Sequence, residues 1–127
     1  VRVVHAPETT IRDGAAAAAG LGDDPPDAVV AVNDAMAIGA LHRLAQLPAE
    51  RRPAVVGFDD IAWAQLTNPP LTTIAIDAER MGAVAAQRLV AAIHDPRVAA
   101  EATVERLPGT LRIRSSCGCH PDGRGST

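Results

Sequence analysis

Acidic and amide side chains follow two short apolar runs of this 127-residue sequence, directly after each run ends. Asn33 and Asp34 follow the first run, and Asp59 and Asp60 follow the second. An ionised Asp accepts several hydrogen bonds from hydroxyl groups, and an Asn amide both donates and accepts. Side chains of these types suit a polyhydroxylated ligand such as a sugar.

Two other interpretations of these carboxylates remain open. The simpler one, which we favour for Asp34 and Asp60, is that each caps the N-terminus of a helix, where Asp is a preferred residue. The other treats the carboxylates as a general acid and base pair, or as metal ligands of a phosphotransfer domain. We disfavour an enzyme and predict no catalytic residue, because the sequence has no Gly-rich phosphate loop, no Gly-x-Ser-x-Gly nucleophile elbow and no His close to the acidic pairs.

A second group that could do chemistry lies near the end of the sequence. Cys117, Cys119 and His120 could offer two thiolates and an imidazole to a metal. Structural zinc sites normally use Cys pairs spaced by two to four residues together with a second ligand pair, and the other histidines lie far from this group in the sequence. We therefore predict no metal site and no cofactor.

The elements that would position the acidic pairs follow from an alternation of short β-branched runs with longer helical patterns, which indicates βαβ units around a parallel sheet. The predicted strands are residues 1–6, 28–32, 54–58 and 72–76, with short ones at 103–107 and 110–114. The predicted helices are 11–19, 35–47 and one that is capped by Asp77 and ends before His94. Ligands of open parallel sheets bind beyond the carboxyl ends of the strands, so we expect Asn33 and Asp59 to face one cleft.

The third predicted helix carries apolar residues at steps of three and four. They are Met81, Val84, Ala85, Leu89, Ala92 and Ile93. A stripe of this kind is typical of a helix face that packs against a core, and we predict that it faces the core.

Charge and composition exclude some classes of partner. The chain has twelve Arg, no Lys and fifteen Asp plus Glu, for a net charge of -3, and Phe58 and Trp63 are its only aromatic residues. A basic patch and an aromatic platform for bases are both missing, so we expect no direct contact with nucleic acid. Since the sequence also has no apolar run of about eighteen residues and no signal-peptide pattern at its start, we expect a soluble segment without a membrane partner.

Three segments, in their order and spacing, resemble the sensor domain of the LacI/GalR-type transcription repressors. They are residues 31–41 (AVNDAMAIGAL), 55–61 (VVGFDDI) and 69–74 (PPLTTI). An Asp-started helix that contains Met81 and Gly82, and the closing segment 111–116 (LRIRSS), extend the resemblance to about residues 28–117.

The resemblance implies an α/β fold, a parallel-sheet βαβ sandwich of the type I periplasmic-binding-protein-like class, present as a partial C-terminal fragment. Residues 1–76 would be part of the C-terminal lobe, 77–114 a hinge return with a helix and closing strands, and 115–127 a flexible tail. The family holds a small-molecule effector, often a sugar, between two lobes and relays binding to an N-terminal helix-turn-helix. This chain would lack that DNA-binding domain, and the protein would be a cytoplasmic homodimer that contacts DNA only through it.

The resemblance also assigns roles to single residues. Asn33 and Asp59 match effector contacts, Thr9 stands where many sugar-binding members have an aromatic ring, and Ile76 stands where many have Gln. Trp63 is a candidate apolar surface for the ligand or for a subunit contact. The dimer interface would use Met36, Ala37, Ala40, Leu41 and Leu44 of one helix face, with Leu66 nearby. The alternative for that helix face is packing within the core.

A periplasmic solute-binding protein of a sugar importer shares this fold and is the alternative function. The Asp59-Asp60 pair and the segment 69–74 favour the repressor, because solute-binding relatives usually differ at both places. Upstream coding sequence would discriminate between them, since a helix-turn-helix supports the repressor and a signal peptide supports the importer. We expect the isolated chain to bind effector weakly, or to cover exposed apolar surface by self-association.

Overall fold

The computed structural model describes residues 1–22, 24–95, 97 and 104–118. The chain forms two units, one of residues 1–75 and 110–127 and the other of residues 76–109. The predicted division differs from this one, because it joined residues 110–114 to the third helix. In the structure, these residues begin with a strand that belongs to the sheet of the first unit.

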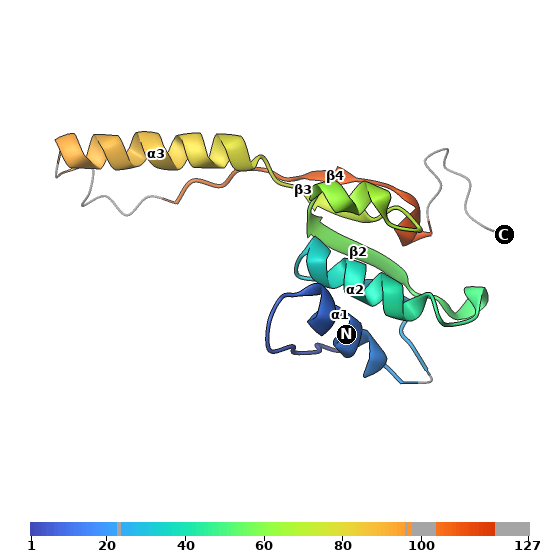
Figure 1. Ribbon diagram of the computed structural model, residues 1–127. Coiled ribbons are helices and arrows are strands. Elements are labelled where there is room, and N and C mark those ends of the chain that lie inside the picture. The colour runs from blue at the N-terminus through green and yellow to red at the C-terminus, as the bar shows by residue number, and fades with distance from the viewer. Residues whose placement is uncertain (23, 96, 98–103, 119–127) are drawn as a thin grey trace. The chain divides into compact units, whose positions relative to one another are not determined.

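A four-stranded sheet of order β1-β2-β3-β4 organises the first unit (Figure 1). The strands are β1 (Ala28–Val30), β2 (Ala54–Asp59), β3 (Thr72–Ala75) and β4 (Thr110–Arg112). The first three run parallel and β4 runs antiparallel to β3. This mostly parallel sheet confirms the predicted α/β class, and the pairing of Asp59 with Ala75 brings the carboxyl ends of β2 and β3 to the same edge.

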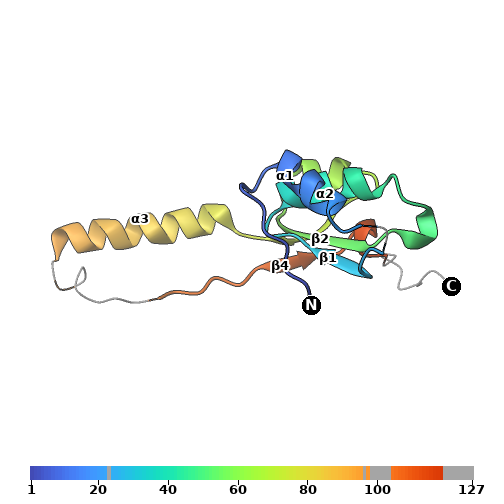
Figure 2. The same ribbon diagram turned by 90° about the horizontal axis from the view of Figure 1, so that it is seen from below.

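Two helices, α1 (Ile11–Ala19) and α2 (Asp34–Leu44), lie on one side of the sheet (Figure 2). Thr10 caps α1 by accepting a hydrogen bond from the backbone N–H of Asp13, and α1 has the bounds that the sequence predicts. The helices approach closely because both contacts are glycines. A Cβ on Gly39 would lie 1.9 Å from the carbonyl oxygen of Ile11, and one on Gly14 would lie 2.2 Å from that of Met36.

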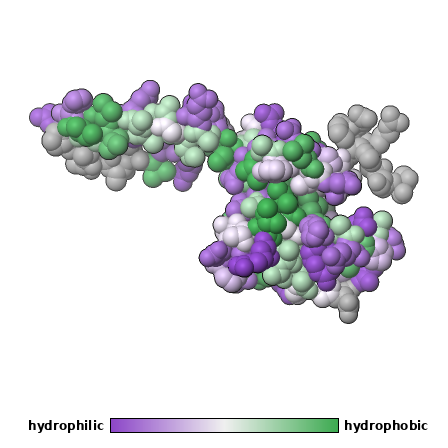
Figure 3. Space-filling view, in the orientation of Figure 1, coloured by the Kyte–Doolittle hydropathy of each residue, from purple (hydrophilic) through white to green (hydrophobic). Residues whose placement is uncertain are grey.

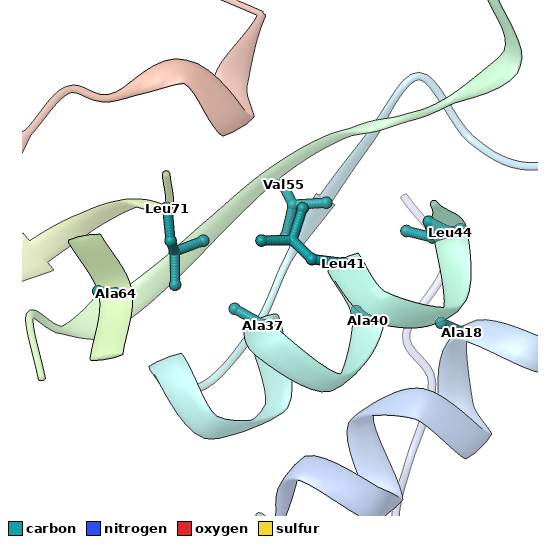
Figure 4. Packing of buried hydrophobic residues seen from close by; sticks show 8 residues of the cluster. All are labelled: Ala18, Ala37, Ala40, Leu41, Leu44, Val55, Ala64 and Leu71. Atoms are coloured by element: carbon teal, nitrogen blue, oxygen red, sulfur yellow. The ribbon is translucent and has the colours of Figure 1, made fainter. Parts of the chain in front are cut away.

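The core of the first unit lies between these helices and the sheet (Figure 4). Its members are aliphatic: Ala18, Ala37, Ala40, Leu41, Leu44, Val55, Ala64 and Leu71. Four of them, Ala37, Ala40, Leu41 and Leu44, were the centre of the predicted dimer interface. Their side chains are buried inside the chain itself, which corrects that expectation in favour of core packing.

The opposite face of the sheet carries apolar side chains that the described chain leaves uncovered. The register places Val30, Val56, Phe58, Ile74 and Leu111 on this face. Val30, Phe58 and Leu111 are exposed, and the other two are half-buried. Parallel sheets normally have both faces covered, so this lobe has an apolar surface suited to further packing.

The second unit consists mainly of α3 (Ala78–His94), which Asp77 caps by accepting a hydrogen bond from the backbone N–H of Arg80, as predicted. Arg88 and Glu105 form an ion pair of 2.9 Å within this unit. The prediction that the apolar stripe of α3 is buried is wrong: Met81, Leu89 and Ile93 are exposed, and no residue of α3 is fully buried. Figure 3 shows apolar side chains on the surface of α3.

Two predicted strands are absent from the described residues. Residues 1–6 and 104–107 are not strands, and Thr103 lies outside the described part of the chain. A strand is stable only where a neighbour accepts and donates its backbone hydrogen bonds, and β1 pairs only with β2 among the described strands. Residues 115–117 form a short 3-10 helix that contains the buried Ser116, so this part of the predicted tail is ordered, while residues 119–127 lie outside the described chain.

Candidate functional site

The turn that follows β2 has an unusual backbone. Asp59, the last residue of β2, has φ of 114°, and Asp60 has φ of 55°. A φ near 55° is the left-handed region, which Asp tolerates better than most residues. The value at Asp59 lies beyond that region, where a non-glycine residue costs about 1–3 kcal/mol. Neighbouring interactions must therefore hold Asp59 in place.

Asp34 provides one of these interactions from beneath the turn. Its side chain is fully buried, and one oxygen accepts a hydrogen bond from the backbone N–H of Ile61 at 2.9 Å. The other oxygen accepts one from the hydroxyl of Thr73, on β3, at 2.6 Å. The prediction that Asp34 caps α2 is therefore wrong, because the cap is Asn33, whose Oδ1 accepts from the backbone N–H of Met36.

Asp60 is held from the other side of the turn by arginine. Nη2 of Arg114 donates to Oδ1 of Asp60 at 2.6 Å, and Nε of Arg112 lies 3.8 Å from Oδ2. The short 3-10 helix after Asp60, Ala62–Leu66, has Ile61 at its N-cap position and no side-chain cap, so the predicted capping role of Asp60 is wrong as well. Arg114 also donates to the carbonyl oxygen of Leu71, which ties this ion pair to the start of β3.

Asp59 differs from its two acidic neighbours. Its half-buried side chain makes no hydrogen bond or ion pair within the described chain. Desolvation by burial and, second, the negative charge of Asp34 raise the pKa of the Asp59 carboxyl above its ordinary value. The turn thus presents one carboxyl group whose acceptor oxygens are free for a ligand.

Asn33 and Thr9 are in direct contact. Nδ2 of Asn33 donates to the carbonyl oxygen of Thr9 at 3.2 Å, while the side chain of Thr9 is exposed. The structure therefore brings together two predicted site residues that are 24 positions apart. Both polar atoms of Asn33 already have a partner, because its Oδ1 caps α2.

The remaining predicted site residues lie in different places. Trp63 and Leu66 are exposed on the 3-10 helix Ala62–Leu66, and Met36 is half-buried on α2. Ile76 is the first residue of the second unit, so it is not part of the geometry described for the first. Asn33, Thr9, Asp59 and Trp63 are the predicted contacts that the first unit itself contains.

Two shallow hollows of the described chain do not coincide with the acidic turn. One lies beside residues 24–27 and 50–53, before β1 and β2 begin, and the other lies between α1 and the end of α2. Neither is lined by Asn33 or Asp59. The acidic turn is therefore an open edge in the first unit rather than a closed pocket.

The described residues contain no group of three or more His, Cys, Asp or Glu side chains that could hold a metal ion. Cys119 and His120 lie outside these residues, and the half-buried Cys117 donates from its Sγ to the carbonyl oxygen of Arg114 at 3.4 Å. None of the helices in the described part of the chain has the length and apolar character needed to span a membrane.

The roles of Asp34, Thr73 and Arg114 were not predicted from the sequence. A signal for Asp34 was present, because it lies three and seven residues before Ala37 and Leu41, on the same face of α2 as the core. A charged residue on the apolar stripe of a helix predicts a buried polar group with dedicated partners. Arg114 had no comparable signal, since its partner Asp60 is 54 positions away.

Comparisons with known proteins agree with this architecture. A family model described as a periplasmic binding protein-like domain matches residues 1–117. The chain is 40% identical over 97 residues to the HTH-type transcriptional regulator GalR of Lacticaseibacillus casei, a match that covers 75% of this chain and 27% of that protein. The chain therefore spans about a quarter of the length of this curated relative.

Solved structures of similar proteins include two with bound sugars. A LacI family transcriptional regulator from Lactobacillus casei with bound glucose has a TM-score of 0.67 and 29% identity, and the match covers 84% of this chain and 39% of that one. A LacI family transcriptional regulator from Enterococcus faecium with bound ribose has a TM-score of 0.69 and 29% identity, covering 84% of this chain and 40% of that one.

Proposed function

Because this chain belongs to the family of periplasmic binding protein-like domains, in the form that LacI/GalR-type regulators carry, we propose that it is an effector-sensing part of a LacI-type transcription repressor. The effector is a sugar or a related polyhydroxylated metabolite. The similarity to regulators with bound glucose and ribose supports this ligand class. The chain carries out no catalytic step.

The observation that carries the proposal is the state of Asp59. Its backbone is held at a φ of 114°, its pKa is raised, and its carboxyl has no partner within the described chain. Each of these features costs stability, and such costs concentrate at functional sites. A sugar hydroxyl that donates to this carboxylate would supply the missing hydrogen bond, and hydrogen bonds to charged groups are among the stronger ones.

The other proposed contacts would add polar and apolar groups to the site. Asn33 and Thr9 border the same edge of the sheet, and Trp63 offers an apolar surface. Ile76, by the resemblance alone, remains a proposed apolar contact. Ligand bound between two lobes would favour the closed state of the regulator, and a helix-turn-helix domain elsewhere in the protein would read that change at DNA.

We also propose a cytoplasmic homodimer. Burial of four of the predicted interface residues leaves Leu66 and Trp63, both more than two-thirds exposed, and the half-buried Met36 as candidates for the subunit contact. Exposed large apolar side chains that lie together are typical of interaction surfaces.

Nuclear magnetic resonance of the ¹⁵N-labelled chain tests the ligand assignment, because it detects binding even at millimolar dissociation constants. Titration with a panel of neutral sugars should shift the amide signals of Asp59, Asn33 and their neighbours for at least one sugar. Asp59→Asn should abolish these shifts. Asp24→Asn removes an exposed carboxylate beside the first hollow and should preserve them. Sugar-induced shifts that persist in Asp59→Asn would place the ligand elsewhere.

Within a complete regulator, Asp59→Ala should abolish the response to effector and leave operator binding intact. The combination matters because a variant that merely fails to fold would lose both. A helix-turn-helix encoded upstream of this chain would support the regulator, whereas a signal peptide there would support an importer's solute-binding protein.

A further inference from the structure

Asp34 connects three separate parts of the first unit through one buried carboxyl group. It is the first residue of α2, it accepts from the hydroxyl of Thr73 on β3, and it accepts from the backbone N–H of Ile61 beyond the acidic turn. The side chain is completely excluded from solvent. Both acceptor oxygens are used, so the group is buried with its hydrogen bonds satisfied.

A glycine in β2, Gly57, leaves room for the carboxyl group of Asp34. A Cβ on Gly57 would lie 2.2 Å from Oδ1 of Asp34, closer than any van der Waals contact allows. A glycine at position 57 therefore lets the carboxylate pass beneath β2 to reach Thr73, whose register partner across the sheet is Gly57 itself.

Asp34 is close in sequence to one proposed ligand contact, and its hydrogen bond reaches a residue close to the other. Asn33 directly precedes Asp34, and Ile61 lies two residues beyond Asp59. The bond from Ile61 to Asp34 thus fixes the turn that carries Asp59 against the start of α2, where Asn33 bonds to Thr9. Without this bond, the turn would keep the ion pair of Asp60 with Arg114 but lose the support from α2 that opposes relaxation of the backbone at Asp59.

We propose that Asp34 is a positioning residue of the effector site: it does not touch the ligand, but it holds the Asp59 turn and the start of α2 in the relation that ligand binding requires. The inference rests on the proposed function only where it assigns Asp59 to the ligand. The link between Asp34 and the Asp59 turn is a property of the chain alone.

The charges around Asp59 make this link measurable. Asp34 faces it from α2, and its charge adds to burial in raising the pKa of the Asp59 carboxyl. Asp60 is adjacent in the turn, but its charge is paired with Arg114, just beyond β4, and lies near Arg112, the last residue of β4. Removal of the Asp34 charge should therefore lower the pKa of Asp59 toward its ordinary value.

Two variants of Asp34 separate charge from geometry. Asp34→Asn keeps the shape, since its oxygen can accept from Ile61 and its amide can donate to the hydroxyl oxygen of Thr73. Asp34→Ala removes both bonds. Asp13→Asn is the matched control, because Asp13 is also a buried aspartate in the first turn of a helix, but its partner is the hydroxyl of Thr10, the N-cap residue of α1.

The measurements are the carboxyl ¹³C titration of Asp59, the amide shift of Ile61 and the sugar titration described above, all on the 127-residue chain. We expect Asp34→Asn to lower the Asp59 pKa while the chain stays folded. Asp34→Ala should move the Ile61 signal and weaken sugar binding about tenfold or more. Where the Ala variant fails to fold, the Asp59 pKa in Asp34→Asn remains the test. Asp13→Asn should change none of these.

An unchanged Asp59 pKa and an unchanged Ile61 signal in both Asp34 variants would overturn the positioning role, whatever the sugar titration shows. A wild-type chain that binds no sugar of the panel would instead count against the proposed function. In that case the Asp59 titration still decides whether Asp34 controls the turn.

Discussion

The close approach of Asp34 to Gly57 makes one substitution, Gly57→Ala, a direct test of how the acidic turn is held. The added methyl group would meet Oδ1 of Asp34 at 2.2 Å, and it would lie 3.1 Å from Leu71 and 3.2 Å from Ala37. The two core neighbours are tight but tolerable. The carboxylate is the contact that must yield, and it has to move by about 1 Å to reach an ordinary separation.

The cost follows from what Asp34 loses when it moves. Oδ1 accepts from the Thr73 hydroxyl at 2.6 Å, and a displacement of this size breaks that bond. A hydrogen bond to a charged group contributes about 1.5–3 kcal/mol, and overpacking of a close-packed core costs about 1–3 kcal/mol. We expect Gly57→Ala to lower the free energy of unfolding by about 3–5 kcal/mol, a large part of the about 5–15 kcal/mol typical of a domain.

Urea denaturation followed by circular dichroism measures this loss. Gly20→Ala is the control in the same unit: Gly20 has ordinary helical backbone, and its nearest neighbour to a new Cβ is at 3.4 Å. That variant should change the free energy of unfolding by less than about 1 kcal/mol.

A double-mutant cycle identifies the cause. Asp34→Ala removes the group that the Gly57→Ala methyl strikes, so the second substitution should cost far less in the background of the first. Costs that simply add, or a Gly57→Ala variant as stable as Gly20→Ala, would refute the steric account of position 57.

Three further predictions concern stability and association. Folding raises the pKa of the Asp59 carboxyl, so ionisation of this group destabilises the folded chain, and stability is lost as the pH rises through that pKa. Asp59→Asn should therefore stabilise the chain at pH 7 and lose this advantage below about pH 4. Urea denaturation at both pH values measures the difference. Ser116→Ala should lower the free energy of unfolding by about 2–4 kcal/mol, because the backbone N–H of Thr72 and the carbonyl oxygen of Val55 lose the buried hydroxyl that they bond to. Ser115→Ala should lower it little, and equal losses in the two variants would contradict this account. The exposed apolar stripe of α3 should make the chain associate at high concentration, which sedimentation velocity measures. The double substitution Leu89→Gln and Ile93→Gln should reduce that association. An unchanged sedimentation profile would show that the stripe is not responsible.

The elements with a clear hydrophobic period were predictable from the sequence. The predicted bounds of α1 are those of the structure, and the predicted β2 and β3 differ from the observed strands by one residue at one end. The parallel sheet followed from the βαβ alternation. Local signals sufficed here because helix caps, glycines and apolar runs act over a few residues.

The failures share a physical reason, which is that they depend on distant partners. Residues 1–6 have the composition of a strand but no neighbouring strand to complete their hydrogen bonds in the described chain. The stripe of α3 has the period of a buried face but remains exposed. The spacing of apolar residues predicts that a helix face is apolar, but it does not predict which part of the protein packs against that face.

The residues of the candidate site also depend on distant partners that the sequence does not reveal. The amide and the three carboxyl groups at positions 33, 34, 59 and 60 have four different roles. Asn33 caps α2 and bonds to Thr9, Asp34 supports the turn from beneath, and Asp60 is paired with Arg114. Asp59 is left as the carboxyl group without a partner in the described chain. Asn33 and Asp59 were predicted equally as ligand contacts from the sequence, but a ligand must displace existing hydrogen bonds at Asn33 and none at Asp59. The structure therefore shifts the proposed recognition of a sugar toward Asp59, with its neighbours acting mainly to hold it in a conformation that it would not adopt alone.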